Sequence, residues 1–546
     1  MIHNPILPGF NPDPAICRVG ADIYIATSTF EWWPGVQIHH SRDLIHWRLA
    51  ARPLTRPSQL DLIGVPDSGG VWAPCLTHAH GRFWLAYTNT VHKQGVFKDT
   101  PNFVVTAERI EGPWSEPVVL NRTGFDPSFF HDDDGRTWLT TMCWNHQPRR
   151  NRFDGIVLQE FDRAASRLIG PVHDIFPGSP LGCCEGPHLY RKDGWYYLLV
   201  AEGGTGWDHA ITVARSRAIT GPYEIHPENP LLTSRGDPAN PLQKSGHGGL
   251  VQLADGSWWV THLCARPLPS AADAARAGTA EPSKPGTGRC LLGRETGIQP
   301  VVWGLDGWPR LAHGGRFPAV TPPAPHLPAH PWPAEPTTFD FDDGVLPVCF
   351  QSPRRPITPD WCDLRSRPGW LRLHGGESPM SRFRQSCLAR RISAWDSTVT
   401  ARLDAAPRHH QHLAALMALY DSEQWYSLGI TWDRDLPGGG GRVLRLAWND
   451  IGTYDQDDAA QVALAPGPVE LRLIIARNLL SCWWRQGDGA WTRIGGDLDA
   501  SKLSDEYGNG TSWNFTGSWF GVQVMDLAGD GWHADIDRIA FTDGAP

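Results

Sequence analysis

The 546-residue sequence lacks any run of eighteen apolar residues, so it offers no candidate for a transmembrane helix. Its first ten residues, MIHNPILPGF, contain neither the basic nor the apolar segment of a secretory signal peptide. We therefore expect a cytoplasmic protein.

A chain of this length exceeds the size that one hydrophobic core usually supports, which predicts two or three domains.

Clusters of basic residues are also missing. The chain has 49 Lys and Arg against 58 Asp and Glu, a net charge of -9, and its basic residues are scattered. This pattern predicts neither a nucleic-acid partner nor a membrane partner, and favours a neutral or small ligand.

The eleven cysteines are odd in number and lack the CxxC spacing of zinc ribbons, which predicts reduced thiols rather than a disulfide framework.

Glycine, proline and tryptophan are abundant instead, with 57, 48 and 27 residues. Gly and Pro at this density interrupt helices, so we expect a β-rich fold. The tryptophans have two interpretations that the composition leaves open. They can fill the core, or their ring faces can stack on the apolar faces of sugars.

One pattern recurs five times in the first 320 residues: a Pro-rich or Gly-rich segment, a turn containing glycine, and an aromatic-rich strand. The turn glycines are 54 to 62 residues apart, which is too long for one hairpin and suits a four-stranded unit. Five such units arranged radially form a β-propeller. The five segments begin at Asp13, Ala73, Asp126, Glu185 and His247.

Equivalent positions of successive propeller blades surround the central axis, so the residues that open each repeat should converge there. Asp13, Asp126, Glu185 and His247 hold these positions, with Trp72 just before the second repeat. Three carboxylates at one phase of a repeat favour an active site. The alternative is coincidence, because Asp is common in turns.

A second domain follows a proline-rich segment. Residues 317–336 contain eight prolines, which stiffen a linker and exclude regular structure. We predict a propeller catalytic domain at 1–320, a linker at 321–336 and a second domain at 337–546. Short alternating segments such as WYSLGITWD predict an antiparallel β-sandwich, a concanavalin/laminin-G-like jelly roll.

The stretch GSPLGCCEGPHLY places Cys183, Cys184, Glu185 and His188 together. It is compatible with a Cys/His metal site, a redox-active cysteine pair, or a carboxylic acid in dry surroundings. Neighbouring side chains of a strand point to opposite faces, so the thiols and the imidazole would not converge on one ion. A regular strand would put Cys183 on the face of Glu185. We therefore interpret both cysteines as packing around Glu185.

The ordered series NPDPAIC, GGVWAP, GFDPSFF, EGPHLY, AEGGTG, SGHGG and LGRETGIQPV resembles glycoside hydrolase family 43, in particular its two-domain β-xylosidases. The resemblance continues through LSDEYG and ADIDRIAF and so covers nearly the whole chain. It implies a five-bladed propeller in which Asp13 is the general base and Glu185 the general acid. Asp126 would tune the pKa of the acid and orient it. Inverting hydrolysis needs such an ionised and protonated pair.

The resemblance also implies the residues that surround the substrate. Arg294 would reach sugar hydroxyls and the carboxylates, and His247 would lie at the pocket floor, as a structural histidine or in a catalytic or calcium-linked role. The segment between Arg266 and Arg289 is longer than usual, so Arg294 depends on its motif. The remaining candidates are Phe30, Trp72 and Phe125 as walls, Thr205 nearby, and Phe515, or Trp513 in its place, as an aromatic residue from the sandwich.

These features together predict an exo-acting, inverting β-1,4-xylosidase that trims xylo-oligosaccharides from the non-reducing end. The alternatives are an α-L-arabinofuranosidase, a dual xylosidase/arabinofuranosidase, and a non-catalytic glycan-binding propeller. No cofactor is required by this chemistry, although Ca²⁺ at the propeller centre stays open. The family resemblance also implies a homo-oligomer, either dimer or tetramer.

Overall fold

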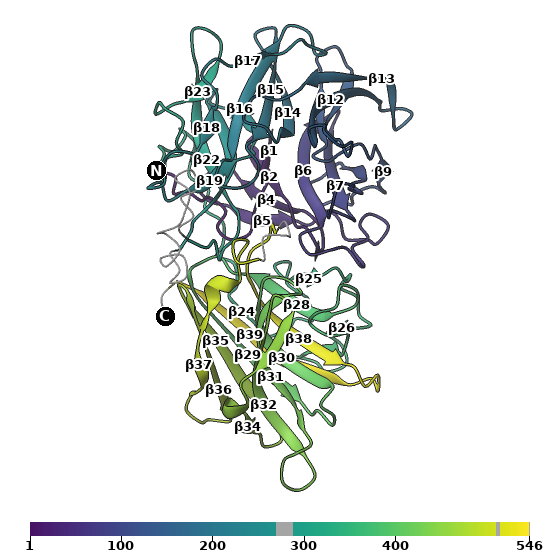
Figure 1. Ribbon diagram of the computed structural model, residues 1–546, viewed down its shortest axis with the longest axis vertical. Coiled ribbons are helices and arrows are strands. Elements are labelled where there is room, and N and C mark those ends of the chain that lie inside the picture. The colour runs from purple at the N-terminus through teal and green to yellow at the C-terminus, as the bar shows by residue number, and fades with distance from the viewer. Residues whose placement is uncertain (269–287, 509–513, 545–546) are drawn as a thin grey trace.

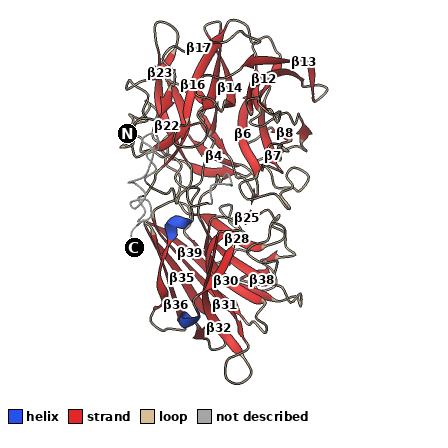
Figure 2. Ribbon diagram, in the orientation of Figure 1, coloured by secondary structure: helices blue, strands red, loops and turns tan. Residues whose placement is uncertain are grey.

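The computed structural model describes residues 1–268, 288–508 and 514–544, which are almost entirely β-structure and form two bodies (Figures 1 and 2). The only helical segments in these ranges are two single 3₁₀ turns, η1 (Asp458–Ala460) and η2 (Ala500–Lys502). No helix of the described residues is long and apolar enough to cross a membrane. The scarcity of helix agrees with the glycine and proline content.

The first body contains five consecutive antiparallel sheets. The first sheet has β1 (Ala15–Val19), β2 (Asp22–Thr27), β4 (Gln37–Ser41) and β5 (Arg48–Ala51). The second has β6 (Gly70–Ala79), β7 (Arg82–Thr90), β8 (Asn102–Ala107) and β9 (Val118–Val119). The third has β10 (Ser128–His131), β11 (Thr137–Trp144), β12 (Phe153–Asp162) and β13 (Arg167–Phe176).

The last two sheets each carry one extra strand. The fourth has β14 (Glu185–Lys192), β15 (Trp195–Glu202), β16 (Ala210–Ser216) and β17 (Glu224–Ile225), with β18 (Leu232–Thr233) on β16. The fifth has β19 (Gln243–Gly246), β21 (Trp258–Ala265), β22 (Glu295–Trp303) and β23 (Pro309–Leu311), with β20 (Leu250–Gln252) on β21.

The repeat predicted from the sequence corresponds to one hairpin in each sheet, and its glycine lies in the hairpin turn. These hairpins form a ring: β1 contacts β6 and β20, and β10 contacts β6 and β14. The ring closes where the Tyr190 hydroxyl of β14 accepts a hydrogen bond from the Leu250 N–H of β20, at 2.8 Å. The predicted five-bladed propeller is confirmed.

The second body is a sandwich of two antiparallel sheets. One sheet has the order β26 (Cys362–Asp363), β27 (Leu371–His374), β39 (His533–Asp543), β29 (Asp396–Ala405), β35 (Val469–Ala476), β36 (Leu479–Gln486) and β37 (Thr492–Asp499), with β24 (Thr338–Phe339) on β39. The other has the order β28 (Ser386–Arg391), β38 (Trp519–Asp526), β30 (His412–Leu419), β31 (Gln424–Asp433), β32 (Gly441–Asp450) and β33 (Thr453–Gln456), with β34 (Val462–Ala463) on β32. In β29 every second side chain is buried, as expected for a strand with one face on the core.

The two bodies are joined by strand pairing and by an aromatic stack. The short strands β3 (Trp32–Trp33) of the propeller and β25 (Ser352–Pro353) of the sandwich pair antiparallel. The rings of Trp32 and Trp519 stack across the same interface, with centroids 3.6 Å apart, and both are 1% exposed or less. One hydrophobic cluster therefore contains residues from both bodies.

The proline-rich segment at 321–336 packs along the propeller. The His330 N–H donates to Asp43 at 2.7 Å, and the Trp332 indole N–H donates to the His46 carbonyl at 3.2 Å. The segment forms no strand, as its seven prolines led us to expect. It runs along blade one before the sandwich begins.

Trp519→Ala tests how much the interface stabilises the protein. Removing a fully buried tryptophan should lower the free energy of unfolding by about 3–5 kcal/mol. Urea unfolding followed by tryptophan fluorescence and circular dichroism would measure the loss. Phe97→Ala, at a side chain that is 62% exposed, is the control. An equal loss in both variants would contradict the role of the stack.

Candidate active site

A cavity of about 430 Å³ lies where the central end of the propeller faces the sandwich, and the three predicted carboxylates line it. Asp13 lies just before β1, Asp126 just before β10, and Glu185 is the first residue of β14. All seven of the other predicted substrate-binding residues line the same cavity: Phe30, Trp72, Phe125, Thr205, His247, Arg294 and Phe515. Trp513 lies outside the described residues.

The entry to each blade has one residue with a left-handed backbone. These residues, with φ between 29° and 59°, are Asp13, Ala73, Asp126, Gly186 and His247. Glu185 is therefore one position earlier than Asp13 and Asp126, in phase with Trp72 and Phe125. This corrects the sequence prediction of three carboxylates at a single phase.

Close packing favours glycine at position 186, because an added Cβ would lie 2.9 Å from the His247 ring. Its φ of +58° is shared by non-glycine residues at the equivalent positions of the other blades, so the backbone conformation alone does not require glycine. The fourth blade therefore carries its acid on the preceding residue. His247 thus packs directly beside the backbone of Glu185, which favours a positioning role for its ring.

Asp13 is held in its ionised form. Its Oδ1 lies 3.2 Å from Arg294 Nη1 and 3.9 Å from His247 Nδ1, and the Ser28 hydroxyl donates to Oδ2 at 2.7 Å. Burial by itself raises the pKa of Asp13, but Arg294, His247 and Ser28 outweigh it and lower that pKa below its usual value. Burial lowers the pKa of His247. Arg294 makes the largest contribution to the lowered pKa of Asp13, ahead of His247.

Glu185 and Asp126 have the opposite environment. Burial, followed by the charges of Asp126 and Asp13, raises the pKa of Glu185 well above its usual value. Burial and the charge of Asp13 likewise raise the pKa of Asp126. The Gly186 N–H donates to Asp126 Oδ2 at 2.9 Å, which favours the ionised form of Asp126. The Gly186 hydrogen bond thus favours Asp126 as the ionised member of the pair and Glu185 as the protonated one.

Aromatic rings from both bodies form the wall. Trp72 meets Phe125 edge-on with ring centroids 5.2 Å apart, and Phe515 meets Trp72 and Phe30 at 5.7 and 6.0 Å. Phe515 belongs to the sandwich, and its backbone N–H donates to the Ser68 hydroxyl of the propeller at 2.9 Å. Such faces suit the apolar side of a sugar ring.

Arg294 connects Asp13 to this wall. Its side chain is 4% exposed, and Nη1 donates to the Thr205 hydroxyl at 2.8 Å as well as to Asp13. Nη2 donates to the Phe515 carbonyl at 3.0 Å. Most of the long segment that precedes it, 269–287, lies outside the described residues.

The cavity lining also includes Phe153, Lys244, Asp505, Glu506 and Asn514, which sequence reasoning missed. Lys244 of the propeller forms a buried ion pair with Glu506 of the sandwich. Burial raises the pKa of Asp505 to about 7, although Lys244 opposes this. The motif LSDEYG, which contains both acids, was the signal that could have identified them.

The cysteine pair beside Glu185 serves as packing. Cys183 lines the cavity, whereas Cys184 is 2% exposed and belongs to the propeller core. Cys183 has a left-handed φ of 51° and precedes the strand, so the alternation of a regular strand does not apply to it. All eleven cysteines are free thiols. Burial, then the charges of Glu185 and Glu202, raises the pKa of Cys183 to about 11.

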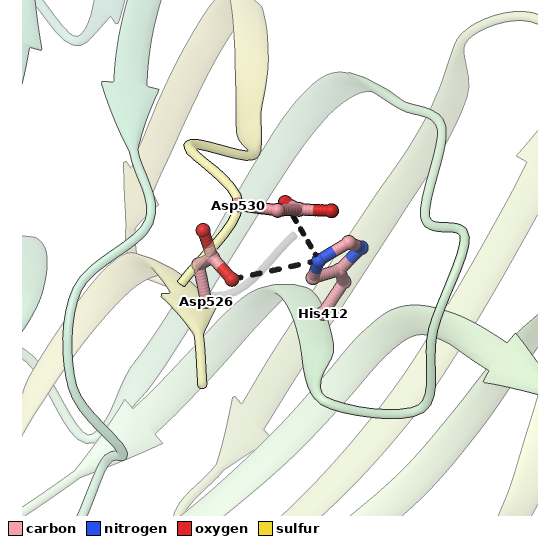
Figure 3. A group of neighbouring side chains, drawn as sticks. All are labelled: His412, Asp526 and Asp530. Carbon is pink, nitrogen blue, oxygen red and sulfur yellow. Dashed lines mark ion pairs between the residues drawn. The ribbon is translucent and has the colours of Figure 1, made fainter. Parts of the chain in front are cut away.

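The described residues contain one group of three His, Cys, Asp or Glu donors close enough to hold a metal ion, and it lies in the sandwich (Figure 3). His412 Nε2 lies 3.5 Å from Asp526 Oδ1 and 3.2 Å from Asp530 Oδ1. However, His412 Nδ1 accepts the Arg408 N–H at 3.2 Å, so a neutral ring carries its proton on Nε2. A metal ion would need that nitrogen unprotonated. We interpret the group as a histidine–carboxylate contact that holds the loop 526–532.

The chain was compared with known proteins. The model of Glycosyl hydrolases family 43 matches residues 2–309, and that of the Beta xylosidase C-terminal Concanavalin A-like domain matches residues 338–542. A Xylan 1,3-beta-xylosidase of Vibrio sp is 45% identical over 99% of both chains. A Xylosidase/arabinosidase 43B of Humicola insolens is 45% identical over 99% of this chain and 97% of its own.

A solved structure agrees. The crystal structure of xylan beta-1,4-xylosidase from Bacillus halodurans C-125 is 46% identical, covers both chains completely and superposes with a TM-score of 0.94. The match to the C-terminal domain confirms the concanavalin-like sandwich. The family model covers more than half of the sequence, and the relatives cover nearly all of it. The chain belongs to glycoside hydrolase family 43 and is a glycosidase.

Proposed function

We propose that this glycosidase releases xylose from the non-reducing end of β-1,4-xylo-oligosaccharides with inversion at the anomeric carbon. The observation that carries the proposal is the opposite electrostatic environment of Asp13 and Glu185 in one aromatic-walled cavity. A non-catalytic glycan-binding module would not need one ionised and one protonated carboxyl group in its cavity. The family is one of hydrolases, so we set that alternative aside.

The mechanism assigns one proton transfer to each carboxylate. Ionised Asp13 accepts a proton from a water molecule as that water attacks the anomeric carbon. Protonated Glu185 donates its proton to the departing glycosidic oxygen, so one C–O bond forms as the other breaks. Asp126, bonded to the Gly186 N–H, keeps the pKa of Glu185 high and fixes the backbone that carries it.

The cavity walls would bind a single terminal sugar. Phe30, Trp72 and Phe125 offer ring faces and edges to its apolar side, and Arg294 and Thr205 offer hydrogen bonds to its hydroxyls. Phe515 adds a wall from the sandwich. A site closed by a second domain favours trimming from one chain end, which is exo action.

Two relatives are named for a different sugar or a different linkage. The Humicola insolens relative is named for both xylosidase and arabinosidase, and the Vibrio relative for the β-1,3 linkage. We therefore keep α-L-arabinofuranosidase, or dual activity, as the second candidate function. Xylopyranose and arabinofuranose offer similar hydroxyl geometry to one pocket.

Calcium at the propeller centre is not part of the proposed function. The metal-like group of three donors found in the described residues does not include His247, and the His247–Asp13 contact of 3.9 Å supplies only two donors. The reaction above uses protein groups alone.

The homo-oligomer and the cytoplasmic location stay predictions, and light scattering would test the oligomeric state.

A substrate panel tests the proposed function. We expect a higher kcat/KM for an aryl β-xyloside than for an aryl α-L-arabinofuranoside, and for β-1,4-xylobiose than for β-1,3-xylobiose. Added EDTA should leave these values unchanged. Faster turnover of the arabinofuranoside would reverse the ranking of the two functions, and loss of activity in EDTA would support calcium near His247.

Glu185→Ala tests the role of the acid. Its loss should reduce turnover of xylobiose by about 10²–10⁴-fold, because a sugar leaving group needs the proton. An activated aryl xyloside, whose leaving group departs as an anion, should lose much less. Glu108→Ala, at a side chain that is 79% exposed, is the control. Equal losses on the two substrates would contradict Glu185 as the acid.

A further inference from the structure

A second cavity, of about 230 Å³, lies between the two bodies and shares no lining residue with the active-site cavity. The propeller contributes Asn11 of the N-terminal segment, Gln37 and His39 of β4, and Arg52 after β5. The sandwich contributes the end of β28, including Arg390 and Arg391. The cavity therefore joins the two domains at a place where no catalytic group is involved.

The charged side chains that line this cavity are mostly positive. Four arginines line it, against the single carboxylate of Glu335, in a chain whose net charge is -9. Arg48 is engaged elsewhere, because its guanidinium lies over the Trp332 ring at 4.1 Å from the centroid. Glu335 accepts a hydrogen bond from the Leu49 N–H at 3.3 Å. The three remaining guanidinium groups, those of Arg52, Arg390 and Arg391, define the site.

Arg52 is 9% exposed and, among the described residues, bonds only to neutral acceptors. Its Nε donates to the Val348 carbonyl at 2.8 Å, and its Nη2 donates to Gln37 Oε1 at 2.7 Å. Its Nη1 is buried and has no hydrogen-bond acceptor among the described residues. These contacts orient the guanidinium without neutralising its charge.

The sandwich arginines repeat this arrangement. Arg391 Nη1 reaches only Asn11 Oδ1 at 3.5 Å, and its Nε and Nη2 are buried without an acceptor in the described part of the chain. Its guanidinium lies about equally far from the Phe10 and Trp519 ring centroids, at 5.1 and 5.0 Å. Arg390 has one long ion pair, with Asp543 at 3.6 Å, and its Nη1 also lacks an acceptor there.

Buried arginines normally have a counter-charge, because a guanidinium in a low-dielectric interior loses its hydration. Burial lowers the pKa of Arg52 to about 9, and burial together with the charge of Arg52 lowers the pKa of Arg391. Both shifts reflect charge that the surrounding protein groups do not compensate. The planar fork of a guanidinium suits the paired oxygens of a phosphate or a carboxylate.

We propose that Arg52, Arg390 and Arg391 form a binding site for one small oxyanion, of the phosphate or carboxylate type, that bridges the propeller to the sandwich. The anion would accept the unpaired guanidinium N–H groups from both domains at once. It would thereby stabilise the interface that also carries the Trp32–Trp519 stack. This site is independent of the proposed hydrolysis.

Isothermal titration calorimetry on the full chain tests the proposal. Inorganic phosphate and sodium acetate are titrated separately, at constant ionic strength maintained with sodium chloride. We expect one saturable site per chain with a Kd of about 1 mM or tighter for at least one probe. The stronger probe identifies the anion class, and its saturable binding should raise the unfolding temperature.

Matched variants locate the site. Arg52→Gln combined with Arg391→Gln should abolish the saturable binding and the thermal shift. Arg109→Gln combined with Arg434→Gln removes the same charge from one exposed arginine in each domain and should change neither. Arg52→Lys, which keeps the charge but loses the planar fork, should weaken binding and serves if the double variant does not fold.

The contrary results are equally specific. Absence of saturable binding of both probes to the unmodified protein would overturn the proposal. Binding that is unchanged in Arg52→Gln with Arg391→Gln would do the same, because it would place the anion elsewhere, such as beside Arg294 in the active-site cavity. Equal loss in the Arg109→Gln, Arg434→Gln control would reduce the effect to net charge.

Discussion

The Arg294 guanidinium is the group on which the rest of the site depends. It is nearly fully buried, and its two terminal nitrogens contact Asp13, the Thr205 hydroxyl and the Phe515 carbonyl. In such surroundings a charge at 3.2 Å acts far more strongly than in water. One side chain therefore keeps Asp13 ionised and also fixes the sandwich segment that completes the pocket. At Glu185, burial and the charges of Asp126 and Asp13 instead raise the pKa, which favours retention of its proton.

This dependence makes the two domains one functional unit. The stack of Trp32 on Trp519, the pairing of β3 with β25 and the Lys244–Glu506 ion pair set the position of Phe515 relative to the propeller. The interface therefore shapes the cavity that holds the candidate catalytic residues. The oxyanion site proposed at Arg52 and Arg391 would lie in the same interface, on residues that take no part in the reaction.

The sequence predicted the repeated hairpins of the propeller and the local strand segments of the sandwich. The five glycine turns identified the hairpins of the blades, and the segment WYSLGITWD, predicted as a sandwich strand, forms most of β31. Glu185 lies one residue before the predicted phase, because the close approach of the His247 ring, which favours glycine at 186, is a three-dimensional constraint. Lys244 and Glu506 are 262 residues apart, and no spacing rule pairs such distant charges. No sequence pattern predicted the cluster of Arg52, Arg390 and Arg391 at the interface, because Arg52 is also far from the other two in the sequence.

The central claim is that water, activated by ionised Asp13, attacks the sugar in one step while Glu185 supplies the proton. The stereochemistry of the product tests this most directly. In proton NMR spectra recorded during rapid hydrolysis of an aryl β-xyloside, the account predicts that α-xylose forms first and the β anomer only later, by mutarotation. If β-xylose forms first, Asp13 acts as a nucleophile and the account is wrong.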